Sequence, residues 1–430
     1  MASTDWFTAA RFGMFVHFGI YSGAARHEWV QTNERLTDEN YRQYFENFDP
    51  DLFDAAAIAR TAKQAGMQYA VLTTKHHDGF ALWNTALSDF SAQAVCGRDL
   101  VGEFVAALRA EGLRVGLYFS LIDWHHPDFT IDWVHPRRDD ENAAALNEGR
   151  DMSRYREFMH GQLRELLTGY GQIDYLFFDF TYPETKKDFS SPESKEGWVG
   201  KSAEDWDAAG LLAMCRELQP GVLINDRLGI PGDFVTPEQY QPTEPVMNDG
   251  VPVIWEACQT TNGSWGYHRD NDDHKAPDLL IRMLADSVSM NGNMLLNIGP
   301  NGRGAVDPRD ARLLGEIGEW MRLHERAIVG AGHAPFVPPR EGVYTLRGNK
   351  LYLHLFSWPM GYVHLPELAG IATYARLLHD GSWLKMSVSD PDQEALVMRP
   401  AGQAMGTLTL SLPTRRPDVA MPVIELTLAE

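Results

Sequence analysis

Residues 69–80 read YAVLTTKHHDGF and carry the strand signal that decides the fold. The run from Tyr69 to Thr74 is apolar and rich in β-branched residues, and it ends abruptly in a lysine, two histidines, an aspartate and a glycine. Such a run predicts a strand buried on both faces of a parallel sheet. The polar residues after it would lie at the sheet edge where α/β proteins bind ligands. A single strand end of this kind can equally be a solvated edge of the sheet. Whether it belongs to a binding site therefore depends on whether the pattern recurs in the chain.

The same pattern recurs through the first three quarters of the chain. Six further strand-like runs are Phe12–Phe18, Val115–Ser120, Tyr175–Asp179, Val222–Asn225, Val253–Ala257 and Met294–Ile298. Segments with helical spacing lie between them: Leu52–Gln64, Leu100–Arg109, Arg154–Leu167, Trp206–Leu218 and Asp278–Ser289. This alternation predicts right-handed βαβ units. Seven or eight units in about 330 residues favour a closed (β/α)8-like, TIM-type barrel over an open sheet. No Gly-x-Gly-x-x-Gly follows a strand, so no dinucleotide cofactor is expected.

The pattern of apolar and polar residues changes after a last predicted helix at Ala311–Val329. Short alternating segments follow, separated by Gly, Pro and Asp turns: Gly342–Arg347, Lys350–Phe356, Tyr374–Leu378, Gly406–Leu412 and Val423–Leu428. They predict a small antiparallel β-sandwich. We therefore expect a catalytic barrel over residues 1–335 and a β-sandwich domain over residues 336–430. Few catalytic residue types occur in the second part, so its predicted role is structural, or at most a rim of the pocket.

Bulk properties exclude several classes of function. The chain has 38 basic and 59 acidic residues and a net charge of −21, which argues against a nucleic-acid or anionic-membrane partner. It begins without a signal-peptide pattern and contains no apolar run of the ~20 residues that a membrane span needs. Cys96, Cys215 and Cys258 are widely spaced, which predicts reduced thiols, a cytoplasmic location and no structural zinc site. The oligomeric state stays open, a homo-oligomer included.

Each predicted barrel strand ends in a chemically useful side chain. These side chains are imidazoles, carboxylates, an arginine and aromatic rings: His17, His76, His77, Tyr118, Asp179, Arg227 and, beyond the sixth strand, Trp265. Hydroxyl groups need directed hydrogen-bond partners, and the C–H faces of a pyranose stack on aromatic rings. A phosphate ligand would call for more cations and backbone-amide nests. The strand ends therefore predict a carbohydrate pocket.

Two carboxylates would then perform the chemistry. Asp179 lies at the end of a predicted strand between two phenylalanines, and an ordinary salt bridge is its alternative role. The second carboxylate is Glu238, in the loop GDFVTPEQY; Glu256, inside a predicted strand, is its rival, and the loop residues Glu184 and Glu244 are weaker candidates. A retaining glycosidase holds its two carboxyl groups about 5–5.5 Å apart and an inverting one about 6.5–9.5 Å apart.

The chain resembles the α-L-fucosidases of glycoside hydrolase family 29. The motifs that carry the resemblance run through residues 6–330: RFGMFVHFGIYS, HEW, TTKHHDGF, LYFSLIDW, the strand that ends in Asp179, INDR, DFVTPE, WEACQTTNGSWGY and NGNMLLNIGPNGRG. The KHHDGF block and the NGNMLLNIGP block are specific in this order and spacing. The C-terminal region is similar to the family's usual β-sandwich.

This resemblance implies hydrolysis of terminal α-L-fucosides with retention, by double displacement, on a fucosylated oligosaccharide or glycoconjugate and without cofactor or metal. Asp179 matches the nucleophile and Glu238 the general acid/base. The residues that match the family's substrate contacts are His17, Glu28, Trp29, His76, His77, Tyr118, Phe177, Phe180, Arg227 and Trp265. Among them, Phe177, Phe180 and Trp265 fall where the family surrounds the C6 methyl of fucose. An apolar pocket suits a 6-deoxy sugar, because a buried 6-hydroxyl would lack a partner.

Three alternatives differ in chemistry. A metal-dependent hydrolase would draw ligands from Asp179 and the histidines His76, His77, His125 and His126, but adjacent histidines on a strand are expected to point to opposite faces. A related glycosidase would act on α-L-galactosides, which the aromatic lining disfavours. A non-catalytic carbohydrate-binding barrel would not need both Asp179 and Glu238.

Overall fold

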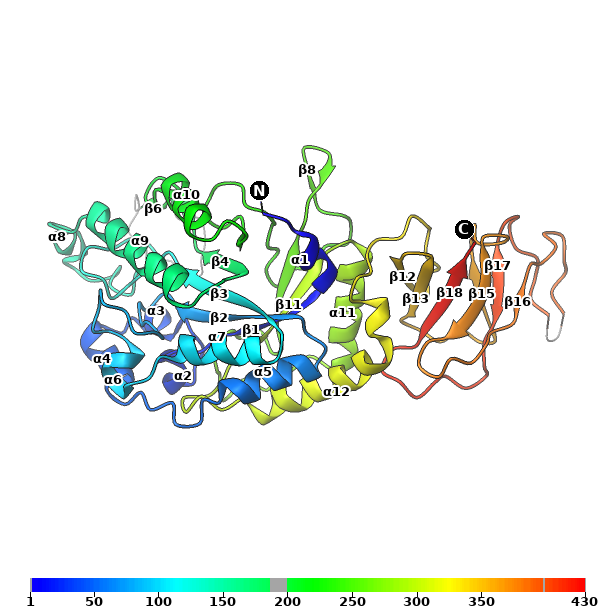
Figure 1. Ribbon diagram of the computed structural model, residues 1–430, viewed down its shortest axis with the longest axis horizontal. Helices are drawn as coiled ribbons and strands as arrows, with labels where there is room; N and C mark the ends of the chain where they lie inside the picture. The colour runs from blue at the N-terminus through cyan, green and yellow to red at the C-terminus, as the bar shows by residue number, and fades with distance from the viewer. Residues whose placement is uncertain (1, 186–198, 397–398, 430) are drawn as a thin grey trace.

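The computed structural model describes residues 2–185, 199–396 and 399–429. The chain forms two parts side by side along its longest axis (Figure 1): a larger part built from parallel strands and helices, and a smaller part of strands at the C-terminal end. The fold is a (β/α)8-like barrel followed by a small antiparallel β-sandwich.

The barrel sheet contains seven strands in the order β10-β11-β1-β2-β3-β4-β7, and every neighbouring pair is parallel. Their bounds are β1 Phe12–Val16, β2 Tyr69–Lys75, β3 Arg114–Ser120, β4 Tyr175–Asp179, β7 Leu223–Ile224, β10 Glu256–Thr260 and β11 Asn293–Ile298. Each overlaps one of the seven predicted strands. The sixth differs most, because the prediction placed it at Val253–Ala257, three residues too early.

An eighth, irregular segment closes the ring between the two ends of this sheet. Residues 234–238 form parallel bridges to Asn225 on one side and to Trp255 and Cys258 on the other. The backbone amide of Cys258 donates to the carbonyl of Pro237 at 3.0 Å. The sequence predicts a loop for this segment, because its proline and its polar residues interrupt any apolar run. Glu238 thus lies on the closing element of the barrel.

Helices follow the barrel strands, and α5, α7 and α12 lie along one outer side of the sheet in Figure 1. The long ones are α5 Ala55–Gln64, α7 Leu100–Ala110, α9 Met152–Gly169, α10 Ala208–Leu218, α11 Pro277–Ser289 and α12 Pro308–His324. Five of these six begin at an aspartate whose side chain accepts a hydrogen bond from a backbone amide of the first turn. Each such cap contributes about 1 kcal/mol.

Shorter elements decorate the barrel. The short helices are α1 Asp5–Ala10, α2 Tyr21–Ala24, α3 Val30–Asn33, α4 Asp38–Glu46, α6 Ala92–Cys96, α8 Ala143–Leu146 and the 3-10 turn η1 Glu325–Ala327. Two small antiparallel sheets pair β5 Tyr182–Thr185 with β6 Val199–Lys201, and β8 Met247–Asn248 with β9 Val251–Pro252.

The C-terminal part consists of two antiparallel sheets. One has the order β12-β13-β18-β15 and the other the order β14-β17-β16. Their bounds are β12 Gly342–Arg347, β13 Lys350–Leu355, β14 Tyr362–Leu365, β15 Ala372–Leu377, β16 Met386–Ser387, β17 Leu408–Ser411 and β18 Val423–Leu428. Leucines from both sheets, Leu353 and Leu410 among them, share one buried cluster, as in a sandwich.

The two parts are packed against each other. The indole of Trp320 in α12 donates to the carbonyl of Met421 at 2.7 Å, and the hydroxyl of Thr345 in β12 donates to the carbonyl of Ala327 at 2.7 Å. The expected division between residues 335 and 336 falls in the segment that joins η1 to β12.

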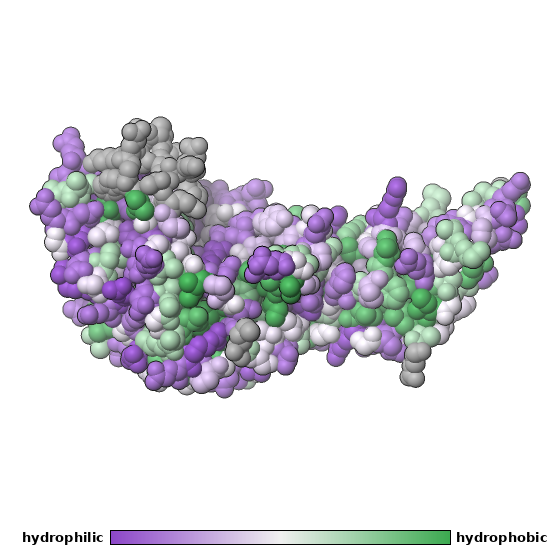
Figure 2. Space-filling model, turned by 90° about the horizontal axis from the view of Figure 1, so that it is seen from above, coloured by the Kyte–Doolittle hydropathy of each residue, from purple (hydrophilic) through white to green (hydrophobic). Residues whose placement is uncertain are grey.

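The surface in Figure 2 is mostly hydrophilic, with several hydrophobic patches, some of them on the C-terminal arm. That arm exposes Met360, Trp383 and Met405. In the part of the chain that the structure describes, no helix combines the length and the apolar character that a membrane crossing requires.

Candidate active site

A pocket opens at the C-terminal ends of the barrel strands, the edge that the sequence pattern indicated. Its walls combine imidazoles, carboxylates, one arginine and aromatic rings: Phe15, His17, Trp29, His76, His77, Tyr118, Phe177, Asp179, Phe180, Arg227, Glu238, Cys258 and Trp265. Eleven of the twelve predicted site residues are in this set.

Arg227 joins the two candidate carboxylates. Its Nη1 donates to Oδ1 of Asp179 at 2.8 Å and to Oε2 of Glu238 at 2.6 Å. Because both oxygens contact one nitrogen, the separation of these two oxygens is at most the sum of these distances, about 5.4 Å, which is compatible with the carboxyl spacing of a retaining glycosidase. Burial acts to lower the pKa of Arg227, but the neighbouring anionic groups, Asp179 first among them, outweigh it and raise that pKa, so the guanidinium stays charged.

The two carboxylates differ in depth. The Asp179 side chain is 14% exposed and the Glu238 side chain 41%. Asp179 also accepts a hydrogen bond from the Tyr118 hydroxyl at 2.8 Å, and Nε2 of His77 lies 3.9 Å from it. A deep, oriented carboxylate suits attack on a bound sugar, whereas a carboxylate at the rim suits contact with the leaving group.

The residue after Asp179 has an uncommon backbone conformation. Phe180 has φ = +80°, which for a bulky side chain costs on the order of 1 kcal/mol and persists only where the surroundings impose it. Its ring lies against Trp29 and His77, with centroids 5.1 and 5.0 Å away. The strained turn therefore brings an aromatic wall beside Asp179.

His76 and His77 both line the pocket, contrary to the expectation that they would point to opposite faces. The reason is that β2 ends at Lys75, so the two histidines lie in a turn where strand alternation no longer holds. Gly79 in this turn has φ = +81°, and a Cβ there would lie 2.2 Å from Oδ1 of Asp123. The two imidazole centroids are 4.0 Å apart.

The imidazoles of the pocket are neutral hydrogen-bonding groups. Burial lowers the pKa of His17 and of His77 to about 3 and that of His76 well below its usual value. Ser120 donates its hydroxyl hydrogen to the carbonyl of Ile122, so its oxygen accepts from Nδ1–H of His77 at 2.7 Å and Nε2 of His77 is left as an acceptor. Nδ1 of His76 is buried and has no hydrogen-bond partner among the described residues.

Asn297, at the end of β11, orients two walls of the pocket at once. Its Nδ2 donates to the carbonyl of Trp265 at 2.7 Å, and its Oδ1 lies 2.6 Å from Nδ1 of His17. This oxygen can only accept, so Nδ1 of His17 carries the proton and Nε2 is the acceptor left for a ligand. Asn297 lies at the end of the seventh predicted strand but, unlike His17 and Trp265, was not among the predicted site residues.

For an aryl α-L-fucoside, the substrate that the sequence resemblance implies, replacing Asn297 by alanine is expected to raise KM and to lower kcat/KM about 10- to 100-fold, since two buried hydrogen bonds of about 1–3 kcal/mol are disturbed. Steady-state kinetics of the purified variant measure this. Asn47→Ala, at the exposed C-terminal end of α4, is the matched control and should retain wild-type values. Wild-type kinetics for Asn297→Ala would contradict the role given to this amide.

Glu28 differs from the other predicted site residues, because it does not line the pocket. It is 3% exposed and accepts a hydrogen bond from the backbone amide of Gly266 at 2.7 Å, directly beside Trp265. Burial raises its pKa to about 7. Phe15 and Cys258 do line the pocket and were not predicted; both point into the barrel from strands whose alternation could have indicated them.

Glu256, the rival second carboxylate, lies away from the pocket. It is fully buried at the start of β10, where Tyr69 donates to Oε2 at 2.6 Å and Tyr175 donates to Oε1 at 2.8 Å. Glu244 is exposed and outside the pocket, and the side chain of Glu184 lies outside the described part of the chain. Glu238 is the glutamate that meets Asp179 in the pocket.

Glu256 predicts a pH dependence of stability. Burial raises its pKa in the folded state to about 8, above the ordinary value near 4.5. A carboxyl group with a raised folded pKa stabilises the fold fully below its unfolded pKa, and this contribution is lost as pH rises through the folded pKa. We therefore expect the free energy of unfolding to fall between pH 5 and about pH 8. Urea unfolding of Glu256→Gln should show a smaller fall than wild type; an unchanged fall would contradict this assignment.

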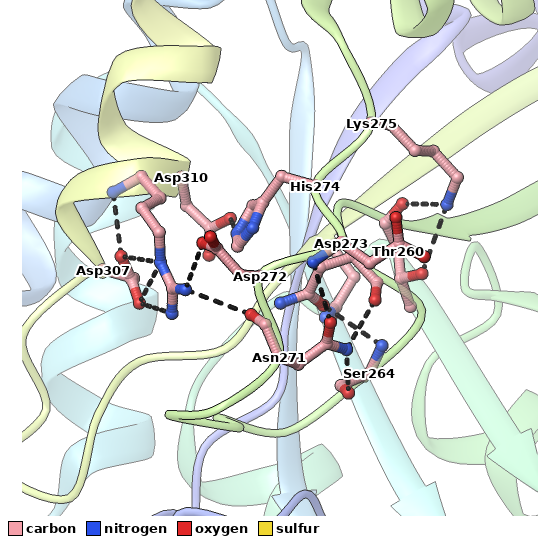
Figure 3. Close-up of polar contacts among 12 residues, drawn as sticks. Thr260, Ser264, Asn271, Asp272, Asp273, His274, Lys275, Asp307 and Asp310 are labelled. Carbon is pink, nitrogen blue, oxygen red and sulfur yellow. Dashed lines mark hydrogen bonds and ion pairs between the residues drawn. The ribbon is translucent and has the colours of Figure 1, made fainter.

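The loop that carries Trp265 is tied to the start of α12 (Figure 3). Asn271 donates to the carbonyl of Asn262 at 2.6 Å and to the hydroxyl of Ser264 at 2.9 Å, and Arg309 reaches the carbonyl of Asn271 at 3.1 Å. Arg309 is itself paired with Asp307, the cap of α12, at 2.8 Å. The pocket aromatic is therefore held on a loop with fixed ends.

A second, wider hollow continues outward from this pocket and shares four of its side chains, Asp179, Phe180, Arg227 and Glu238. Its own walls are contributed mainly by Trp133, Tyr182, Pro183, Ser202, Glu204, Asp226 and Thr236. A ligand in the inner pocket would project its leaving group past Glu238 into this hollow.

No group of three or more His, Cys, Asp or Glu side chains within the described ranges is arranged to hold a metal ion. The barrel instead presents two carboxylates at retaining distance beside neutral imidazoles and stacked aromatic rings. This combination of fold and site defines a retaining glycoside hydrolase.

Comparison with known proteins identifies the family. The model of the alpha-L-fucosidase family matches residues 1–326, and the chain belongs to that family. It is therefore an enzyme, an α-L-fucosidase that hydrolyses its substrate with retention.

Individual relatives span nearly the whole chain. Tissue alpha-L-fucosidase of Bos taurus is 28% identical over 92% of this chain and 84% of its own. The structure of alpha-L-fucosidase isoenzyme 1 from Paenibacillus thiaminolyticus is similar with a TM-score of 0.89 and 43% identity over 99% of both chains. A GH29 alpha-L-fucosidase of Bacteroides thetaiotaomicron, trapped as a covalent intermediate with 2-fluoro-fucosyl fluoride, has a TM-score of 0.81 and 28% identity over 99% of this chain and 96% of that one.

Proposed function

We propose that Asp179 is the nucleophile and Glu238 the general acid/base in the hydrolysis of terminal α-L-fucosides. The observation that carries this assignment is the shared contact of both carboxylates with Nη1 of Arg227, which limits the separation of their nearest oxygens to about 5.4 Å. The trapped covalent intermediate of the Bacteroides relative supports a double displacement.

In the first step, Asp179 attacks the anomeric carbon while Glu238 gives its proton to the glycosidic oxygen. The C–O bond to the aglycone breaks, the aglycone leaves as an alcohol, and the sugar is joined to Asp179 as an ester. Arg227 and the Tyr118 hydroxyl orient the attacking carboxylate before reaction.

In the second step, Glu238 is ionised and takes a proton from water. The resulting hydroxide attacks the anomeric carbon, the ester bond to Asp179 breaks, and fucose leaves with its original anomeric configuration. The ion pair with Arg227 holds the Glu238 side chain beside Asp179 in both steps.

The pocket walls support fucose as the sugar. The neutral histidines offer acceptor nitrogens to hydroxyl groups, whereas Phe177, Phe180 and Trp265 supply apolar surface for the C6 methyl. The 6-hydroxyl of an α-L-galactoside would be buried against these rings without a partner, which costs about 1–3 kcal/mol. This cost favours the fucoside over the galactoside about 10- to 100-fold in kcat/KM.

The proposed substrates are fucosylated oligosaccharides or glycoconjugates, whose remainder would occupy the outer hollow. We also propose a cytoplasmic location, which the three free cysteines support. Cell fractionation with antibody detection would test it, and recovery of the protein outside the cytoplasm would overturn it.

One experiment tests the activity. An aryl α-L-fucoside, α1,2-, α1,3-, α1,4- and α1,6-linked fucosides and an aryl α-L-galactoside are incubated with the enzyme, and the first-formed anomer is followed by NMR. We expect α-L-fucose as the first product and poor turnover of the galactoside. First formation of the β-anomer would overturn the mechanism. Fucose binding without turnover of any fucoside would revive the non-catalytic barrel.

A further inference from the structure

A basic hollow lies between the C-terminal end of α12 and the β12–β13 hairpin, where barrel and sandwich meet. Its volume is about 590 Å³, within the range of small-molecule sites. Its charged walls are Arg322, Arg326, Arg347 and Lys350, with Glu325 as the one acidic side chain among the described lining residues. The ring of Tyr352 contributes to the lining.

This concentration of positive charge contrasts with the rest of the molecule. The chain has 59 acidic against 38 basic residues, so a face chosen at random would carry more carboxylates than cations. The described lining of this hollow has four cationic side chains and one carboxylate. The overall negative charge of the protein repels anions, whereas the local positive potential at this hollow attracts them.

The cations of the hollow are poorly neutralised. The side chain of Arg322 makes no hydrogen bond or ion pair with any residue in the described ranges. Arg326 lies 3.9 Å from Glu425, a carboxylate that already pairs with Arg376 at 2.8 Å. Within the described ranges, the polar side-chain contacts of Arg347 and Lys350 are with neutral groups, the carbonyl of Val329 and the hydroxyl of Thr427.

Helix stabilisation explains only part of this arrangement. Arg322 and Arg326 lie at the C-terminal end of α12, where cations complement the helix dipole. Arg347 and Lys350 come from a separate hairpin and still converge on the same hollow. Burial and the charge of Glu425 raise the pKa of the Tyr352 phenol, and the charges of Arg326, Arg347 and Arg376 oppose this rise.

We propose that this hollow binds an oxyanion-bearing ligand, a phosphate or sulfate ester. Guanidinium groups match the oxygen spacing of phosphate and sulfate and bind them in bidentate fashion. The hollow is larger than one oxyanion requires, so the ester's organic part has room beside the Tyr352 ring.

The site is separate from the sugar pocket. The start of α12 holds the Trp265 loop through Arg309 (Figure 3), whereas the hollow lies at the opposite end of this 17-residue helix. At 1.5 Å per residue the helix is about 25 Å long. A ligand here is therefore no extension of a bound fucoside, and fucosidase kinetics should not depend on these arginines.

Isothermal titration calorimetry of the full chain tests the proposal. The probes are sodium pyrophosphate and a sulfated disaccharide, titrated against sodium chloride of matched ionic strength. We expect one saturable site per chain, and a Kd at least tenfold weaker in the double variant Arg322→Gln, Arg347→Gln. Arg312→Gln, an exposed position on the same helix outside the hollow, is the matched control and should bind within twofold of wild type.

Both variants should keep the wild-type thermal midpoint and the wild-type kcat/KM on an aryl fucoside, which separates this result from misfolding and from any failure of the proposed catalytic function. Tighter binding of pyrophosphate would identify phosphate esters as the ligand class. Tighter binding of the sulfated disaccharide would identify sulfated glycans as that class. Heats no greater than those with chloride, or an unchanged Kd in the double variant, would overturn the proposal.

Discussion

Asp179→Ala is expected to lower kcat/KM on an aryl α-L-fucoside by about 10⁴-fold or more, because no other carboxylate in the described pocket can form the covalent intermediate. Glu238 remains but cannot replace a nucleophile beneath the sugar. The fold should survive, since Asp179 is a partly exposed residue at the end of β4. Steady-state kinetics and the thermal midpoint measure the two effects.

Added azide sharpens the test of Asp179. The space left by the carboxylate admits azide on the face opposite the leaving group, so one direct displacement should give β-L-fucosyl azide. The exposed Asp89→Ala is the matched control and should react as wild type without azide products. Retention of more than a few per cent of activity in Asp179→Ala would show that another group is the nucleophile.

Glu238→Ala is expected to lower kcat/KM by about 10²- to 10⁴-fold on a fucosyl disaccharide, the usual range for loss of a general acid/base. The loss should be smaller on an aryl fucoside with a good leaving group, because that leaving group departs without a proton. The difference between the two substrates is the readout, since a merely structural defect would reduce both equally.

Azide distinguishes this variant from the first. In Glu238→Ala the fucosyl ester with Asp179 still forms, and azide then attacks it without needing a general base, so the product should be α-L-fucosyl azide. Glu244→Ala, an exposed glutamate nearby in sequence, should leave both substrates unaffected. Full activity of Glu238→Ala on the disaccharide would refute the assignment.

The barrel was predictable because its signals are local. The apolar run Tyr69–Thr74 and the similar runs after it predict buried parallel strands, and all seven appear in the structure. The C-terminal strands β12 and β18 begin and end at the predicted residues, because turn residues mark their ends.

Elements whose conformation depends on closure of the barrel were not predicted correctly. The segment 234–238 does not resemble a strand, since Pro237 and its polar neighbours obscure the pattern, yet it completes the barrel by bridging β7 and β10. The predicted sixth strand ended at Ala257, whereas β10 continues to Thr260 and begins at Glu256. Polar residues are tolerated there because they have hydrogen-bond partners: Tyr69 and Tyr175 for Glu256, the carbonyl of Tyr240 for Gln259, and Gln239 for Thr260.

The residue types of the site were determined by the sequence alone: histidines after β2, an aspartate at the end of β4, an arginine after β7 and an aromatic loop after β10. Their roles were decided by the tertiary structure. Glu238 and Glu256 are similar candidates in the sequence, but barrel closure brings Glu238 to Arg227 and Asp179 and buries Glu256 between two tyrosines. Sequence periodicity fixes which face of an element a residue occupies, whereas the distance between two carboxylates depends on how distant strands meet around the ring.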